Sequence, residues 1–199
     1  MAAGVLAEAG SELMFRHALI RQALHDGLPV AVRVGLHAHV ARGFADAGAS
    51  WDRVARHLLA APQAIGGWVL TWLAGLPASA LYAQPAIAAE LLDHARRVCL
   101  PGDPRRELFT ARLCTVLRLL RRPDDLVALG EEALASVTDP KLLGEIAWNL
   151  ARGYRMTGRS DDGNAVITRV LDGPDPGVPW RSRLRAEQAH LLLSDGHVG

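Results

Sequence analysis

The sequence has very little lysine, few aromatic residues and no excess of either charge. Lys141 is the only lysine, and aromatic residues make up 5% of the 199 residues. The formal net charge is +1, from 22 basic and 21 acidic residues. This balance creates no global field that would draw the chain to nucleic acid or to anionic lipid. We therefore expect no direct nucleic-acid binding by this chain.

Cysteine is almost absent too. Cys99 and Cys114 are the only two, and neither belongs to a C-x-x-C pair of the kind that ligates metals. This favours buried thiols in a reducing cytosol, with a disulfide between the two as the alternative. Glu8 and Glu12 interrupt any apolar leader, so secretion is not expected and the predicted location is cytoplasmic.

The motifs that mark common catalytic sites are missing. The chain has no G-x-x-x-x-G-K-[ST] loop to cradle phosphates, and no serine stands in a nucleophile-elbow context. The closest histidine pair, His37 and His39, is two residues apart, so on a helix the side chains point to different faces. We expect a non-enzymatic chain without cofactor or metal.

One long stretch carries no charged side chain. It runs from Leu58 to Ala89, and its apolar part around Trp68 to Leu73 raises the question of a membrane span. Proline and glycine interrupt the stretch repeatedly, so no run of about 20 apolar residues remains for a bilayer. A buried or interface helix is the better interpretation.

The N-terminal half is predicted to be mostly helical. Leu6 to Phe15 favours a small β-hairpin with its turn at residues 8–11. Glycine and proline then separate helical patterns, and Ser50 is placed to cap one of them through its hydroxyl. The expected helices cover residues 16–26, 29–48, 51–61, 64–76 and 85–99.

Beyond Pro104 the chain repeats with a period of 37 residues. A helix over 105–122 is followed by a partner that starts at Pro123, and the pattern returns after Asp139. At this offset Arg122 superposes on Arg159, and Asp124 and Asp125 superpose on Asp161 and Asp162. A third copy starts at Pro179. The sequence therefore predicts an all-α fold of antiparallel helix pairs.

The segment from Trp148 to Tyr154, followed by Gly158, Asp161 and Asp162, resembles a tetratricopeptide repeat. Gly163 and Asn164 depart from the usual pattern, which has small and apolar residues there. The resemblance implies a right-handed superhelical array over residues 62–199. A generic helical bundle is the alternative, and it shares the all-α prediction.

The first sixty residues contain a second set of recognisable segments: Phe15 to Leu24, Arg33, Leu36-His37 and Val54 to Leu58. Together these segments resemble the end of the ATPase module in large ATP-binding LuxR-type transcriptional regulators. The resemblance implies that residues 1–61 are a winged-helix-like remnant that leads into the repeats. It also implies that His17 contacts nucleotide phosphate in a parent protein. A structural capping or core histidine is the alternative for His17, because Arg16 and Ala18 depart from the family pattern.

The first helix of each tetratricopeptide pair lines a groove, which suggests a partner-binding surface. In this register the groove residues are Thr115, Arg118, Glu145, Trp148, Arg152, Arg155, Arg183 and His190. An arginine-rich groove with a tryptophan suits a protein or peptide partner, especially an acidic one. The alternative is a merely solvated face.

Two functions are compatible with these patterns. The first is a non-catalytic regulatory and protein-interaction segment of a LuxR-type regulator. The second is a free-standing helical-repeat adaptor or scaffold with no role in transcription. Both lead us to expect exposed apolar helix faces and homodimerisation through them. No pattern identifies the inducer, the partner or the regulated pathway.

Overall fold

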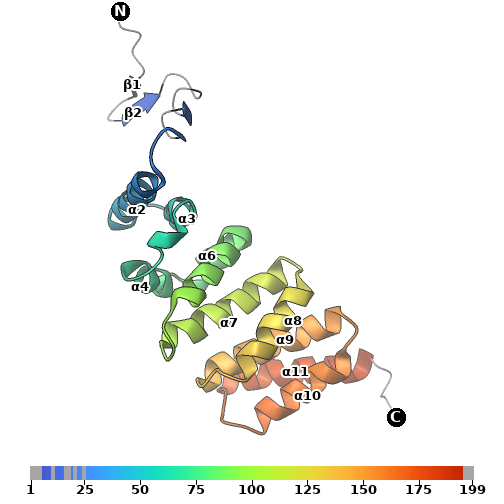
Figure 1. The fold of residues 1–199 in the computed structure, drawn as a ribbon. Helices are drawn as coiled ribbons and strands as arrows, with labels where there is room; N and C mark the ends of the chain where they lie inside the picture. Colours follow the sequence, from blue (N-terminus) through green and yellow to red (C-terminus); the bar gives the residue numbers. More distant parts are fainter. Residues whose placement is uncertain (1–5, 10–11, 16–18, 20–21, 24–25, 195–199) are drawn as a thin grey trace, which may run out of the picture. The chain divides into compact units, whose positions relative to one another are not determined.

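The computed structural model describes residues 6–9, 12–15, 19, 22–23 and 26–194, and these form two compact units. The first unit covers Met1–Ala64 and the second covers Ile65–Gly199. Within the described residues the architecture is ten α-helices, α2 to α11, packed as sequential antiparallel pairs (Figure 1). The all-α prediction is thereby confirmed. The predicted domains, a winged-helix-like remnant over residues 1–61 and repeats over residues 62–199, stay predictions.

The first unit is built around the pairing of α2 (Val30–Asp46) with α3 (Trp51–Leu59). Ser50 occupies the N-cap position of α3 as predicted, but its side chain makes no capping hydrogen bond. The short 3-10 helix η1 (Pro62–Ala64) contacts both helices. The buried side chains of the two helices are Ala41, Val54, Ala55 and Leu58.

Two short strands precede these helices. They are β1 (Leu6–Ala9) and β2 (Glu12–Phe15), which pair antiparallel with Leu6 opposite Phe15. Glu8 and Ala9, expected in a turn, belong to β1. His17 and most of the helix expected over 16–26 lie outside the described residues.

The second unit begins with the uncharged stretch. It forms α4 (Trp68–Gly75), α5 (Ala78–Ala83) and the start of α6 (Pro85–Val98). Val69, Leu70 and Leu73 of α4 are buried, which explains why this stretch carries no charge. Across the described part of the chain, every helix is too short or too polar to cross a bilayer.

Five further helices follow in the second unit: α7 (Pro104–Leu119), α8 (Pro123–Leu134), α9 (Pro140–Met156), α10 (Ser160–Leu171) and α11 (Val178–Ser194). Each helix packs against the next along the chain (Figure 1), and in addition α9 contacts both α7 and α11. Buried Phe109, Leu126, Leu150, Ile167 and Leu191 contribute one large side chain from each of these helices.

The 37-residue repeat extends to atomic contacts. Arg122 Nε donates to Asp125 Oδ2 at 2.7 Å, and Arg159 Nε donates to Asp162 Oδ2 at the same distance. The backbone amide of Arg122 donates to the carbonyl of Leu117, five residues earlier. In the same way, the backbone amide of Arg159 donates to the carbonyl of Tyr154. The two copies therefore use the same turn between their helices.

Gly163 stands at a close approach of three helices. A β-carbon built on it would lie 3.2 Å from the Ala151 carbonyl oxygen of α9 and 3.1 Å from Leu191 Cδ1 of α11. Its neighbour Asn164 accepts a hydrogen bond from Gln188 Nε2 at 2.9 Å. Both departures from the usual repeat pattern therefore serve local contacts.

The shared turn yields a test, because the two copies place different residues in its left-handed position. Gly158 has a φ of 74°, and Arg121, at the same place in the preceding copy, has a φ of 54°. A side chain in this region costs about 1–2 kcal/mol, and the greater unfolded-state entropy of glycine offsets part of that cost. We expect Arg121→Gly to raise the free energy of unfolding by about 0.5–1 kcal/mol and Gly158→Ala to lower it by about 1 kcal/mol. Urea unfolding followed by circular dichroism measures both, and equal signs for the two variants would contradict the assignment.

Candidate functional site

The predicted groove residues lie on α7, α9 and α11, whose mutual contacts bring them onto one continuous face. This face contains a hollow of about 710 Å³. Its walls are Ala78, Tyr82, Leu108, Arg112, Thr115, Arg118, Leu119, Glu145, Trp148, Trp180 and Arg183. We call this set the α7–α9–α11 hollow. Arg152 and Arg155 lie farther along α9, and His190 is exposed on α11 and does not line the hollow.

Trp148 is the centre of this face. Three guanidinium carbons lie near its ring centroid: that of Arg152 at 4.8 Å, that of Arg118 at 5.1 Å and that of Arg183 at 6.0 Å. Arg183 also stacks 4.6 Å from the ring centroid of Trp180, whose own ring is 6.2 Å from that of Trp148. Indole rings attract cations through their negative faces. One aromatic side chain of α9 thus gathers positive charge from three helices.

Asn149, next to Trp148 in sequence, is fully buried and joins α7 to α9. Its amide oxygen accepts from Arg118 Nε at 2.9 Å. Its amide nitrogen donates to Thr115 Oγ1 at 3.0 Å and to the Glu145 carbonyl at 2.9 Å. Since a buried amide is costly without partners, these bonds set the orientation of Arg118 across the hollow.

Glu187 neutralises two of the predicted groove arginines. Its side chain is only 5% exposed, and its carboxylate oxygens lie 3.2 Å from Arg152 NH1 and 3.0 Å from Arg155 Nε. Such a buried carboxylate needs its cationic partners. Arg152 and Arg155 therefore form a structural ion pair between α9 and α11. The other two predicted groove arginines, Arg118 and Arg183, are not part of it.

The other end of the hollow is polar and half-buried. Thr115 Oγ1 donates to Glu145 Oε1 at 3.1 Å. Burial raises the pKa of Glu145 and that of Tyr82. Hydrogen bonding with Thr115 acts in the opposite direction on both groups. Arg112 donates to the carbonyls of Leu73 at 3.0 Å and Ala74 at 3.3 Å, which satisfies the C-terminal end of α4.

The surroundings of Arg118 disfavour its positive charge. Burial lowers the pKa of its guanidinium, and repulsion from Arg152 lowers it further. In the described part of the chain neither Arg118 nor Arg183 has a carboxylate within ion-pair distance. An anion beside Arg118 would offset this repulsion from Arg152.

Sequence analysis missed Asn149, Glu187, Tyr82 and Trp180. A polar Asn149 flanked by Trp148 and Leu150 was a usable signal, because a polar residue at a core position of a helix needs partners. Tyr82 and Trp180 gave no such signal. Tyr82 precedes the repeats, and Trp180 lies in the third copy but at none of the groove positions of the register. Both line the hollow, from α5 and from the start of α11.

The remaining predicted features do not form a second site. Both cysteines are free and buried, and burial raises the pKa of the Cys114 thiol to about 12. Among the described residues there is no group of three or more side chains suited to hold a metal ion. His17 lies outside these residues.

No protein-family model, curated protein or solved structure matches this chain.

The buried amide of Asn149 gives a test of the network. Asn149→Ala removes the buried acceptor of Arg118 Nε and one of the two side-chain hydrogen bonds of Thr115, and an unsatisfied buried polar group costs about 1–3 kcal/mol. We expect the free energy of unfolding to fall by that amount in urea titrations. Asn164→Ala is the matched control, because Asn164 is only half-buried and should cost less. A smaller loss at position 149 than at 164 would show that the network does not stabilise the α7–α9 contact.

Proposed function

We propose that the chain is a non-catalytic regulatory and protein-interaction segment of a LuxR-type transcriptional regulator. In this proposal the second unit is a tetratricopeptide-like array, and the α7–α9–α11 hollow binds an acidic segment of a partner protein. The observation that carries the binding role is the convergence of Arg118, Arg152 and Arg183 on the ring of Trp148.

The repeat contacts support the tetratricopeptide-like assignment. Helices α7, α9 and α11 are the first helices of successive repeats, and each contacts the next of these first helices. The turns after α7 and α9 share one hydrogen-bond pattern and one Arg–Asp contact. Stacked repeats with the same connection between their helices place their first helices on a common face. Such a face is where an extended partner segment would lie.

The charge distribution supports an acidic partner. Glu187 compensates Arg152 and Arg155 within the fold. Arg118 and Arg183 keep their positive charge directed at the hollow, and their planar guanidinium groups suit carboxylate recognition. The aromatic rings of Trp148 and Trp180 offer apolar contact beside them. Charged and aromatic groups together are typical of residues that dominate binding energy at interfaces.

A peptide titration tests the binding role. The probes are a fluorescein-labelled peptide of alternating Glu and Ala, and its counterpart with Lys for Glu. We expect fluorescence anisotropy to show binding of the acidic peptide alone, weakening as salt is added. Arg118→Ala and Arg183→Ala should each weaken that binding by about tenfold, as expected for loss of one charge-assisted contact of about 1.4 kcal/mol.

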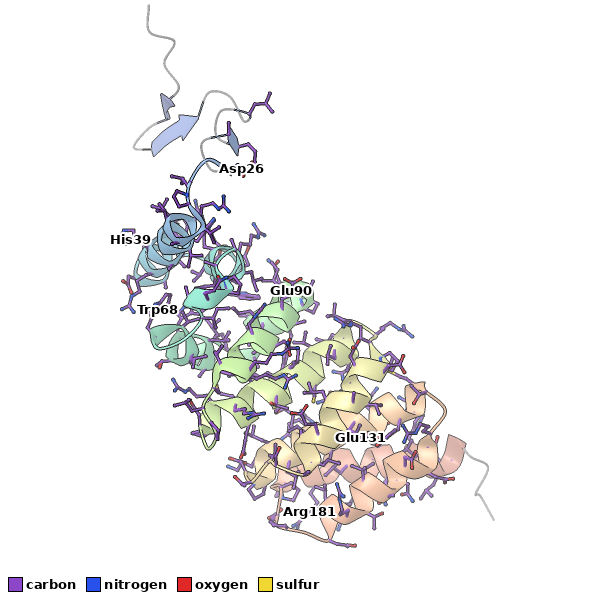
Figure 2. All side chains as sticks on the ribbon, viewed as in Figure 1. Asp26, His39, Trp68, Glu90, Glu131 and Arg181 are labelled. Carbon is purple, nitrogen blue, oxygen red and sulfur yellow. The ribbon has the colours of Figure 1, made fainter. Side chains whose placement is uncertain are left out.

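Arg181→Ala is the matched control for the peptide titration. Arg181 lies two residues from Arg183 on α11 and pairs with Asp175 at 2.8 Å (Figure 2). Its replacement should leave acidic-peptide binding unchanged. Equal affinity for the two peptides, or no effect of the double variant Arg118→Ala with Arg183→Ala, would remove the acidic-partner proposal.

The regulator assignment is tested separately in the coding sequence. A phosphate-binding loop upstream and a helix-turn-helix downstream in the same reading frame would support it. A reading frame with neither would favour the free-standing helical-repeat adaptor. The assignment rests on the resemblance in Phe15 to Leu24, and most of these residues lie outside the described structure.

Homodimerisation stays a prediction, now attached to α11. Val178 is 75% exposed and Leu193 is 63% exposed on this helix, which leaves apolar surface open. We expect size-exclusion chromatography with light scattering to give a dimer mass at high protein concentration. Leu193→Glu should shift the mass to that of a monomer, because it places a charge in the apolar contact. A monomer for the unchanged chain at every concentration would rule the dimer out.

A further inference from the structure

Two histidines join the helices of the first unit. His37 of α2 and His57 of α3 are both half-buried, and their Nδ1 atoms lie 3.0 Å apart. Their ring centroids are 5.2 Å apart, and the ring of Phe44 lies 5.5 Å from that of His57. This contact links residues twenty positions apart, on the two helices that pair in the first unit.

Proton counting limits the states in which this contact can exist. A hydrogen bond between two Nδ1 atoms needs one nitrogen that carries a proton and one that does not. At least one ring must therefore be neutral. When both rings are protonated, two donors and two positive charges face each other at a distance where the repulsion is strong.

The surrounding charges add to this repulsion. Arg53 of α3 lies with its guanidinium carbon 4.3 Å from the ring centroid of Phe44 and acts on His57 as a second cation. The acidic groups on these helices have their own partners: Asp46 pairs with Arg42 at 3.0 Å, and Asp52 pairs with Arg56 at 3.1 Å. Helix η1 contributes Pro62, Gln63 and Ala64, which do not titrate.

On α2, the remaining titratable groups are Arg33 and His39. Arg33 NH1 donates to the carbonyl oxygens of Asp26 and Leu28 at the start of the helix. His39 is exposed and points away from α2 (Figure 2). Within the described residues, the charged groups that act on His57 are thus His37 and Arg53, both basic.

We propose that the His37–His57 contact is a pH-sensitive joint, which holds α2 against α3 near neutral pH and loosens their packing in mildly acidic solution. Burial lowers the pKa of His57 from its ordinary value of 6.5, and the charges of His37 and Arg53 lower it further. Since the unfolded chain then binds the proton more readily, the stabilisation is complete above pH 6.5 and declines as the pH falls below it. The direction is opposite to that of a histidine paired with a carboxylate.

Hydrogen exchange of the whole chain tests this joint. We expect the amides of α3 around Val54 and Leu58 to exchange several-fold faster at pH 5 than at pH 7.5, after correction for the intrinsic pH dependence of exchange. Amides of α9 in the second unit serve as the internal reference and should keep their protection. An α3 protection that does not change with pH would overturn the proposal.

Variants separate the joint from general acid effects. His37→Gln keeps a side chain able to hydrogen-bond His57 but cannot become charged, so the acid-induced change in α3 exchange should disappear. His39→Gln is the matched control on the same helix and should behave as the unchanged chain. A pH response that survives His37→Gln would overturn the proposal.

Direct titration of the rings covers the case in which His37→Gln disturbs folding. In the unchanged chain, the imidazole proton signals followed by NMR should show one half-buried histidine with a titration midpoint below 6.5. A midpoint at or above 6.5 for His57 would overturn the proposal.

Discussion

The contact between α7 and α9 is the constraint on which the candidate site depends. A buried polar network holds it, in which the amide of Asn149 meets Thr115, Arg118 and the backbone of Glu145. Because a buried amide without partners is costly, the two helices stay in one register. That register directs Arg118 over the ring of Trp148 and lets the face continue onto α11.

The arginines on this face fall into two groups, those in a structural ion pair and those that line the hollow. Glu187 is buried and takes Arg152 and Arg155, so these side chains fasten α9 to α11. Arg118 and Arg183 remain directed at the hollow beside two indole rings. A solvated-face interpretation explains neither the burial of Glu187 nor the convergence on Trp148. The division favours a binding surface built on a rigid, ion-paired support.

The two units are held together by different kinds of contact. The second unit relies on apolar cores and on arginine contacts that keep their charge across the accessible pH range. In the first unit, Ala41 is the buried residue of α2. The contact of α2 with α3 includes the His37–His57 pair, which requires at least one neutral ring. Acidification is therefore expected to act on the α2–α3 contact before it affects the repeat helices.

Much of the fold could be predicted because the signals are local. Pro85, Pro123 and Pro140 each begin a helix as expected, since proline suits the first helical turn. Pro104, expected in a break before the helix over 105–122, begins α7. The superposition of Arg122 on Arg159 pointed to a repeat, and in the structure both side chains donate to the aspartate three residues on. The helix expected over 29–48 is present as α2, but its apolar Val30 is 62% exposed. Periodicity marks a helix face but does not say whether another element covers it.

By itself the sequence determined the helices, their period and the composition of the first-helix face, because capping and periodicity act over a few residues. Only the tertiary structure decided which arginines remain available, since Glu187 is about thirty-five residues from Arg152 in the chain and meets it through packing alone. It also decided that Tyr82 and Trp180 complete the hollow and that His37 meets His57. Charge pairing and burial are properties of neighbours in space, and the order of residues along the chain does not specify them.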